Sequence, residues 1–492
     1  MIHRILTIVL GMVVSIVVSR AQIVLGNERN HLDAFREAAH NEFEDFRRQA
    51  MSDFIAFVRN PWKEFEHTAP TPLPDEKPVP LVTMPEEDRQ KVINSTPIEI
   101  EEVVEPPVVP TQPQPPVPIE EMPVKEVKYT AFTFFGTRCS VRFDSSDKLK
   151  LCGTDNEDVA DALNTMKEGC YDNMIIDCLS LRDSLQLSDW AYLQMLRLLA
   201  YSIEGDNTNT ATLLLAYMYM QSGYRMRLAA YNGQLYMLYA SKHHVYDMVS
   251  FEIDGETYYG IEKLPSQLFV CQASFPKERS MSLWINTCQK FSYVPSVERK
   301  IVSKRYDNIR ISVAVNRNLI DFYNTYPTSI VNDNVMTRWA MYANTPMEEG
   351  IRNTVYPPLK RKIVGMSQKE AVERLLNLVQ TGLEYEYDDK VWGGDRAFFS
   401  EESLYYPCCD CEDRAILLTR LIRDILGLKC ILVFYPGHLA AAIEFTEAGV
   451  GGDYIAYDGH KYVVADATYI NAPVGKTMPG MDNSKAKVIL LE

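Results

Sequence analysis

Three side chains in the last part of this sequence have the types and the order that nucleophilic catalysis requires. Cys411 lies in the stretch P-C-C-D-C-E-D-R-A, His438 follows a Pro-Gly pair, and Asp466 ends the apolar stretch Y-V-V-A-D. A cysteine attacks an acyl carbon through its sulfur, a histidine moves the proton, and a carboxylate fixes the histidine tautomer. The order therefore predicts Cys411 as the nucleophile, His438 as the base and Asp466 as the orienting acid.

The residues after Cys411 have the spacing of a helix that begins at this cysteine. Apolar side chains recur about one helical turn apart on the face that carries Cys411, and a glycine then predicts the end: Ala415, Leu418, Ile422, Ile425 and Gly427. Asp410 and Asp413 form a candidate capping box. A helix N-terminus lowers the pKa of a thiol, but the adjacent carboxylates oppose this effect. We therefore expect an imidazolium partner to be needed for a thiolate.

The other groups of the site are less strongly indicated. His460 is an alternative base, but it follows Asp458-Gly459, a hairpin-turn sequence that should direct it into water. The oxyanion of an acyl intermediate would be met by the backbone N–H of Cys411 and by a second donor. Trp392 and Tyr406 are candidates for that donor or for the lining of the cleft, and packing is the alternative role for both.

The same three segments resemble the signature segments of a known superfamily. C-D-C-E-D-R-A-I-L-L, G-H-L-A-A-A-I and V-A-D-A-T-Y are similar to those of the transglutaminase-like superfamily, whose papain-like folds include cross-linkers, deamidases and peptidases. The resemblance covers roughly the last quarter of the chain and matches Cys411, His438 and Asp466 to the family nucleophile, base and acid. It implies an α+β, papain-like catalytic domain at residues 365–492, with a helix packed on an antiparallel sheet.

An internal repeat suggests a second copy of this domain upstream. The stretch that begins G-D-N-T-N-T-A-T can be aligned without a gap on C-D-C-E-D-R-A-I at a constant offset of about 204 residues. The three catalytic positions then carry Asn207, Gln234 and Glu262. An amide cannot act as a thiolate or shuttle a proton near neutral pH, so residues 128–265 are predicted to be a degenerate transglutaminase-like domain in tandem. The alternative is a chance similarity of two helix–strand–strand units.

The N-terminal part predicts export and assembly. Residues 1–21 have the short basic start, apolar run and small-x-small end of a signal peptide, with an uncleaved membrane anchor as the alternative. Residues 28–67 predict a long amphipathic helix, on which Phe35, Phe46 and Phe57 recur at an 11-residue period. Such a stripe, within residues 28–65, indicates self-association or a partner helix, or packing on the chain's own globular part.

Two further regions connect these units. Residues 68–127 are rich in Pro, Val and Glu, which predicts a disordered, extended linker. Residues 266–364 contain β-rich runs such as R-I-S-V-A-V and predict a connecting region of mixed structure.

The net charge and the spacing of motifs argue against some partners and cofactors. The net charge of −16 argues against a nucleic acid as the partner. Cys408, Cys409 and Cys411 lack the spacing of a zinc site, and the sequence has no D-x-D-x-D-G calcium loop. We therefore expect no metal and no cofactor, and no membrane span after removal of the signal.

Taken together, these features predict an exported cysteine-dependent enzyme that transfers acyl groups from peptide or protein amides. It would be periplasmic or extracellular, at a bacterial envelope, and would act as a peptidase, a deamidase or a cross-linker. The alternative is a non-catalytic envelope scaffold that assembles through its N-terminal helix.

Overall fold

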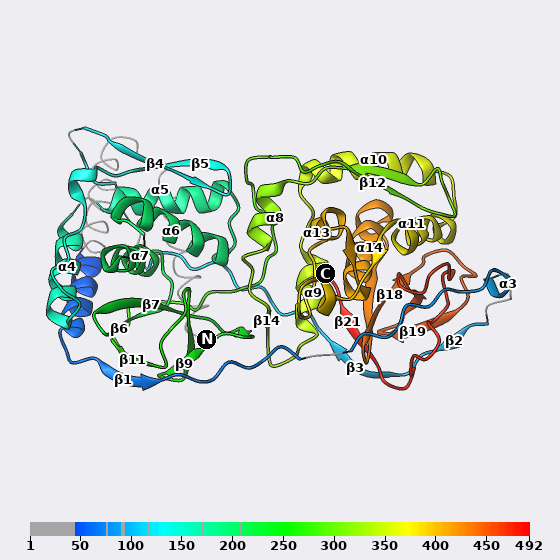
Figure 1. Cartoon of the computed structure of the whole chain (residues 1–492), viewed down its shortest axis with the longest axis horizontal. Helices are drawn as coiled ribbons and strands as arrows, with labels where there is room; N and C mark the ends of the chain where they lie inside the picture. Colours follow the sequence, from blue (N-terminus) through cyan, green and yellow to red (C-terminus); the bar gives the residue numbers. More distant parts are fainter. Residues whose placement is uncertain are drawn as a thin grey trace, which may run out of the picture.

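The structure is a computed structural model of the 492-residue chain. It describes residues 45–74, 77–89, 94–116, 119, 121–124, 126–169, 171–206 and 208–492. The predicted signal peptide, the first part of the 28–67 helix and Asn207 lie outside the described residues. The fold is a mixture of helices and largely antiparallel sheets, arranged as two lobes side by side (Figure 1).

The C-terminal lobe is built on a seven-stranded sheet with the order β2-β19-β20-β18-β17-β21-β3. Its antiparallel strands are β17 (Cys430–Tyr435), β18 (His438–Glu444), β19 (Asp453–Tyr457), β20 (His460–Ala465) and β21 (Ala486–Leu490). Helix α14 (Cys411–Leu426) packs against β18 and β17 and is covered by α11 (Gln368–Gly382), α13 (Ser400–Tyr405) and α9 (Thr337–Asn344). The helix therefore lies on one face of the sheet, with its first residue toward the β17–β18 turn.

The N-terminal lobe has a six-stranded sheet with the order β1-β11-β6-β7-β10-β9. The strands are β1 (Lys63–Glu66), β6 (Met226–Tyr231), β7 (Gln234–Ala240), β9 (Ser250–Ile253), β10 (Glu256–Gly260) and β11 (Gln267–Val270). Helix α7 (Asn209–Gln221) packs on β6 and β7, and α6 (Asp189–Glu204) packs on α7. Further helices, α4 (Asn156–Glu168) and α5 (Tyr171–Ser184), and the hairpin β4 (Tyr129–Phe134) and β5 (Thr137–Arg142) complete the lobe.

The two sheets share a strand order. The run β11-β6-β7-β10-β9 in one lobe corresponds to β21-β17-β18-β20-β19 in the other. Strands β6, β7 and β10 begin at residues 226, 234 and 256, and each begins 204 residues before β17, β18 and β20, at 430, 438 and 460. In each lobe a buried helix directly precedes the first strand of this set.

The N-terminal helix ends at residue 58, so the prediction that it continues to 67 was wrong: Pro61 cannot continue a helix, and Lys63–Glu66 form strand β1. Its described part, residues 45–58, lies against the N-terminal lobe. Phe54 is buried and meets Phe275 edge to face at 6.1 Å, and Arg47 forms an ion pair with Asp172. Phe46 and Phe57 on the stripe are 44% and 46% exposed. One face of this part of the helix thus packs on the chain's own lobe, and self-association through the other face stays a prediction.

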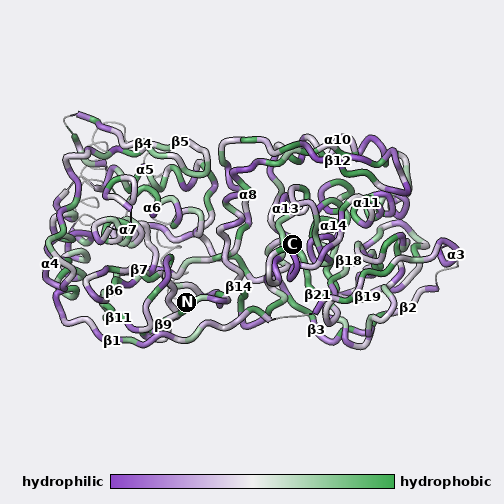
Figure 2. Tube along the Cα trace, viewed as in Figure 1, coloured by the Kyte–Doolittle hydropathy of each residue, from purple (hydrophilic) through white to green (hydrophobic). Residues whose placement is uncertain are grey.

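The Pro-rich segment is more ordered than its composition predicts. Strands β2 (Thr96–Pro97) and β3 (Ile100–Val104) pair in parallel with β19 and β21 at the two edges of the C-terminal sheet. The non-proline residues of an extended chain keep free N–H and C=O groups, which an open sheet edge can bind. Helix α3 (Glu86–Arg89) in the same segment is strongly hydrophilic (Figure 2).

Residues 266–364 are of mixed structure, and besides β11 and a hairpin they contain the short strand β14 (Ser329–Ile330), which pairs with β8 (His244–Val245). Strands β12 (Arg299–Val302) and β13 (Arg310–Val313) form a hairpin, after which α8 (Arg317–Tyr323), α9 and α10 (Glu349–Ile363) lead into α11. Within the described residues, no helix is both long enough and apolar enough to span a membrane.

Candidate active site

Cys411 is the first residue of α14 and is buried, with 4% of its surface exposed. The N-cap residue is Asp410, and its backbone N–H donates to Asp413 Oδ2 at 3.3 Å. At the other end the helix stops at Gly427, whose φ of 68° is the left-handed conformation that ends many helices. The helix expected from the apolar spacing therefore has the expected start and end.

His438 and Asp466 meet across neighbouring strands. His438 opens β18 and Asp466 directly follows β20, and the two strands pair in the sheet. The Nε2 atom of His438 lies 2.8 Å from Asp466 Oδ2, and both side chains are buried. The other oxygen, Asp466 Oδ1, accepts the backbone N–H groups of Thr468 and Tyr469 at 2.9 and 3.0 Å. Both carboxylate oxygens are thus committed, and one of them fixes the imidazole ring.

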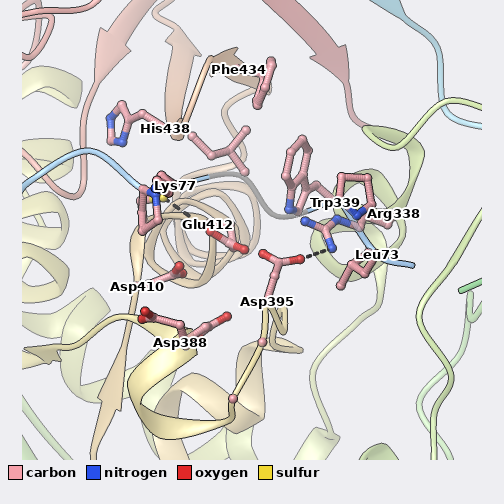
Figure 3. Close-up of a pocket in the computed structure, with 18 of the residues that line it drawn as sticks. Leu73, Lys77, Arg338, Trp339, Asp388, Asp395, Asp410, Glu412, Phe434 and His438 are labelled. Atoms are coloured by element: carbon pink, nitrogen blue, oxygen red, sulfur yellow. Dashed lines mark hydrogen bonds and ion pairs between the residues drawn. The ribbon is translucent and has the colours of Figure 1, made fainter. Parts of the chain in front are cut away.

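The remaining ring nitrogen of His438 is unpartnered, and the residue borders a cavity that it shares with Cys411. Its Nδ1 atom is buried and has no hydrogen-bond partner. Cys411 and His438 both line a cavity of about 560 Å³ (Figure 3). The nucleophile and the base predicted from the sequence therefore border one cavity, and the predicted acid is hydrogen-bonded to the other ring nitrogen of the base.

Burial and charge keep the Cys411 thiol protonated in this arrangement. Burial raises the pKa of the thiol well above its ordinary value, and the carboxylates of Asp410 and Glu412 raise it further. The thiol donates to Glu412 Oε2 at 3.3 Å, while the backbone N–H of Leu439 hydrogen-bonds the sulfur and partly opposes the shift of the pKa. Burial and the neighbouring acids therefore outweigh the helix N-terminus, which by itself would lower the pKa of the thiol.

An acidic cluster that the sequence analysis missed surrounds the cysteine. Burial and the charge of Glu412 raise the pKa of Asp388 to about 8, and burial likewise raises the pKa values of Asp410 and Asp413 well above the usual range. Arg338 pairs with Asp395 on the rim of this cluster (Figure 3). The acidic stretch around residue 388 was visible in the sequence, but its approach to the cysteine was not.

Some of these side chains could hold a metal ion. Ligand atoms of Asp388, Asp395 and Glu412 lie within 4.8 Å of one another, as do those of Asp388, Asp410 and Asp413. Hard cations such as Ca²⁺ and Mg²⁺ prefer oxygen ligands of this kind. The expectation that the chain uses no metal rested on motif spacing alone, and these residues come together from separate segments.

Two aromatic candidates lie apart from the cavity. Trp392 and Tyr406 pack against each other with ring centroids 4.8 Å apart, and the guanidinium of Arg396 lies 4.3 Å from the Trp392 ring centroid. Neither aromatic side chain lines the cavity that contains Cys411. Their position supports the packing role and not that of an oxyanion donor.

Gln380 of α11 positions the acid and was not identified from the sequence. Its Nε2 atom lies 2.9 Å from the carbonyl oxygen of Asp466 and 2.8 Å from that of Tyr469. The side chain is buried and so fixes the loop that follows β20. A glutamine on the apolar face of an amphipathic helix was the only signal for it.

The corresponding place in the N-terminal lobe holds different chemistry. Gln234 opens β7 as His438 opens β18, and its amide donates to the carbonyl of Leu235. Glu262 accepts from Arg197 and Tyr201. Among the described residues at this place, no thiol faces an imidazole.

The fold and the site thus define an α+β protein with a buried Cys–His–Asp arrangement in its C-terminal lobe. Compared with models of known families, with curated proteins and with solved structures, the chain matches none of them.

A change of Glu412 tests the electrostatic account of the thiol. Glu412→Gln keeps the size of the side chain and removes its charge. The Cys411 thiolate is then repelled by one carboxylate fewer, so the pKa of the thiol falls. We expect the pH profile for alkylation of Cys411 by iodoacetamide to move to lower pH, and its rate at neutral pH to rise several-fold. Glu349→Gln, at an exposed position of α10, serves as the control. Identical profiles for both variants would contradict this account.

Proposed function

We propose that the chain is a cysteine-dependent acyl-transfer enzyme that acts on peptide or protein amides. Its catalytic domain, residues 365–492, would have a papain-like fold of the transglutaminase-like superfamily. The observation that carries the proposal is the state of His438, which has one nitrogen bound to Asp466 and the other unpartnered beside the cavity of Cys411. A satisfied core histidine would have both nitrogens paired or exposed to water.

The proposed reaction begins with attack of Cys411 Sγ on the amide carbon, while the thiol proton passes to Nδ1 of His438. Because the pKa of the thiol is raised, this proton moves during the attack and not before it. The C–N bond then breaks as the imidazolium returns the proton to the leaving nitrogen, and an acyl thioester remains on Cys411. Water or an amine attacks the thioester, His438 takes up its proton, and the thiol is restored.

The carboxylate of Asp466 supports this proton transfer. Burial alone raises its pKa, but the His438 ring and the two backbone N–H donors outweigh burial and hold the pKa below its usual range. Asp466 therefore stays ionised and stabilises the imidazolium that forms during the reaction. Water as the acceptor gives hydrolysis or deamidation, and an amine gives cross-linking.

The shared strand order favours a tandem duplication. Three strands begin at a constant offset of 204 residues, and the sheets have the same core order. We infer that residues 128–265 are a degenerate copy that lost the catalytic side chains. Export to a bacterial envelope, from the leader at residues 1–21, and assembly through the stripe of Phe46 and Phe57 belong to the same proposal.

The proposal is tested by the site at which the protein becomes acylated. We expect a brief incubation with p-nitrophenyl acetate, followed by acid quenching and peptide mapping, to place the acetyl group on Cys411. The exposed Cys152 provides an internal comparison, and Cys411→Ala should lose the label. Acetylation of Cys152 with none on Cys411 would refute the proposed nucleophile.

A further inference from the structure

A stretch of the Pro-rich segment crosses the candidate active site from one lobe to the other. We call residues 68–74 and 77–79 the strap. On the N-terminal lobe, Thr68 and Ser250 exchange backbone hydrogen bonds of 2.7 and 3.4 Å, and the N–H of Asp247 donates to the carbonyl of Thr71 at 2.9 Å. On the C-terminal lobe, the N–H of Val79 donates to the carbonyl of Gly437 at 3.0 Å. The strap is therefore fastened on both sides of the cavity.

Between these anchors the strap forms one wall of the cavity that holds Cys411 and His438. Its lining residues are Pro72, Leu73, Pro74, Lys77 and Pro78. Leu73 and Lys77 lie around the same space as His438 and Glu412 (Figure 3). A peptide that reached Cys411 along this path would have to take the position of the strap.

The turn before the base is shaped to receive the backbone of the strap. Gly437 has a φ of 75°, and a Cβ atom at this position would lie 2.5 Å from the carbonyl oxygen of Lys77. Glycine is thus required here both by the backbone conformation and by the close approach of the strap. Since Gly437 directly precedes His438, the strap contacts the same turn that carries the base.

The charge of the cavity fits a basic occupant. Its lining includes six acidic side chains, of which Asp388 and Asp410 have raised pKa values and would ionise more readily beside a bound cation. Lys77, one of the few cations in the lining, comes from the strap itself, and the acids are Asp247, Asp388, Asp389, Asp395, Asp410 and Glu412. Proline also keeps the strap extended, so that its remaining backbone N–H and C=O groups are available for pairing.

We propose that the groove above Cys411 binds an extended peptide that carries a basic side chain, and that the strap occupies this groove in cis. The consequence for catalysis, that a substrate must displace the strap, rests on the proposed function. Because only the fraction of molecules with an open groove can bind, occupation by the strap weakens the apparent affinity for any such peptide.

The proposal is tested by direct binding, without any chemical step. The probe is a fluorescent peptide with the sequence of residues 71–79, T-P-L-P-D-E-K-P-V, and the readout is anisotropy. The proteins carry Cys411→Ala, and the strap is weakened by Leu73→Asp and Val79→Pro, which add a charge to the acidic cavity and remove the N–H bound by Gly437. The matched control changes the same residue types outside the cavity lining, as Leu81→Asp and Val108→Pro.

We expect the weakened strap variant to bind the probe roughly tenfold more tightly than the control protein. A probe in which the lysine is replaced by glutamate should bind roughly tenfold more weakly to the same variant. Equal affinity of the variant and the control for the probe would overturn the proposal. Hydrogen exchange of the wild-type chain gives a second test, because the Val79 amide should be protected, and exchange at the random-coil rate would equally overturn it.

The two proposals can fail separately. Acylation of Cys411 without peptide binding would refute only the role of the strap. Peptide binding without acylation of Cys411 would refute only the proposed chemistry.

Discussion

Asp466→Asn should lower the rate of Cys411 acylation about 100-fold or more while the protein stays folded. One carboxylate oxygen of Asp466 accepts a hydrogen bond from His438 Nε2, and the other accepts hydrogen bonds from two backbone N–H groups. An asparagine can turn only its single oxygen toward one of these sites, and its NH₂ group then meets a donor at the other. If the NH₂ group faces His438, the ring proton moves to Nδ1, and the base can no longer accept the thiol proton.

The measurement is the second-order rate with p-nitrophenyl acetate, read as acetyl-Cys411 and accompanied by a thermal melt. Asp482→Asn changes the same residue type at an exposed turn and should have no effect on the rate. A rate for Asp466→Asn within a factor of about two of the wild type would show that Asp466 caps a loop and does not orient the base.

Arg338→Ala should lower the free energy of unfolding by about 3–5 kcal/mol, because it leaves buried carboxylates without their cation. The Arg338 side chain is only 6% exposed, pairs with Asp395 and lies 4.8 Å from the Trp339 ring centroid. Burial alone lowers the pKa of Arg338, but the charges of Asp395 and Glu412 outweigh it and raise that pKa. The loss should therefore be larger where these acids are ionised.

The pH dependence of the wild type follows from the same cluster. Burial raises the pKa of Asp388 from 3.8 to about 8, so the folded protein holds a proton that the unfolded chain releases. The free energy of unfolding therefore falls as the pH rises from 3.8 to about 8, because protonated Asp388 favours the folded state only at the lower pH. Between pH 5 and pH 8, thermal or urea unfolding should show a larger fall in the free energy of unfolding for Arg338→Ala than for Arg338→Lys, which keeps the charge. Arg361→Ala on the exposed side of α10 is the surface control, and an equally small effect of both alanine variants would contradict the account.

The sequence was most informative where local rules decide the structure. Helix α14, strand β18 that begins at His438 and strand β20 that ends just before Asp466 follow from apolar spacing, from an N-cap aspartate and from turn residues, which act over a few positions. The candidate site residues Cys411, His438 and Asp466 could be named because each lies at the end of such an element, and because their order resembles that of a known superfamily. The pairing of His438 with Asp466 then required only that β18 and β20 be neighbours.

The missed features depend on contacts between distant segments. Gln380, Arg338 and Asp388 reach the site from three elements upstream of Cys411, and nothing in their local sequence indicates that approach. The Pro-rich segment has the composition of a disordered chain, yet sheet edges and the cavity wall hold it in place. Such partners exist only after the lobes have folded, so composition alone assigns the segment to a free linker.

The most direct test of the account is the rate of Cys411 acylation by p-nitrophenyl acetate at neutral pH in the wild type and in His438→Ala. Cys411→Ala supplies the background from other nucleophiles. If the sulfur and the imidazole act as one unit, His438→Ala should react about 1,000-fold more slowly than the wild type. Equal rates in the two proteins would mean that Cys411 and His438 do not act together, and would contradict the proposed enzyme.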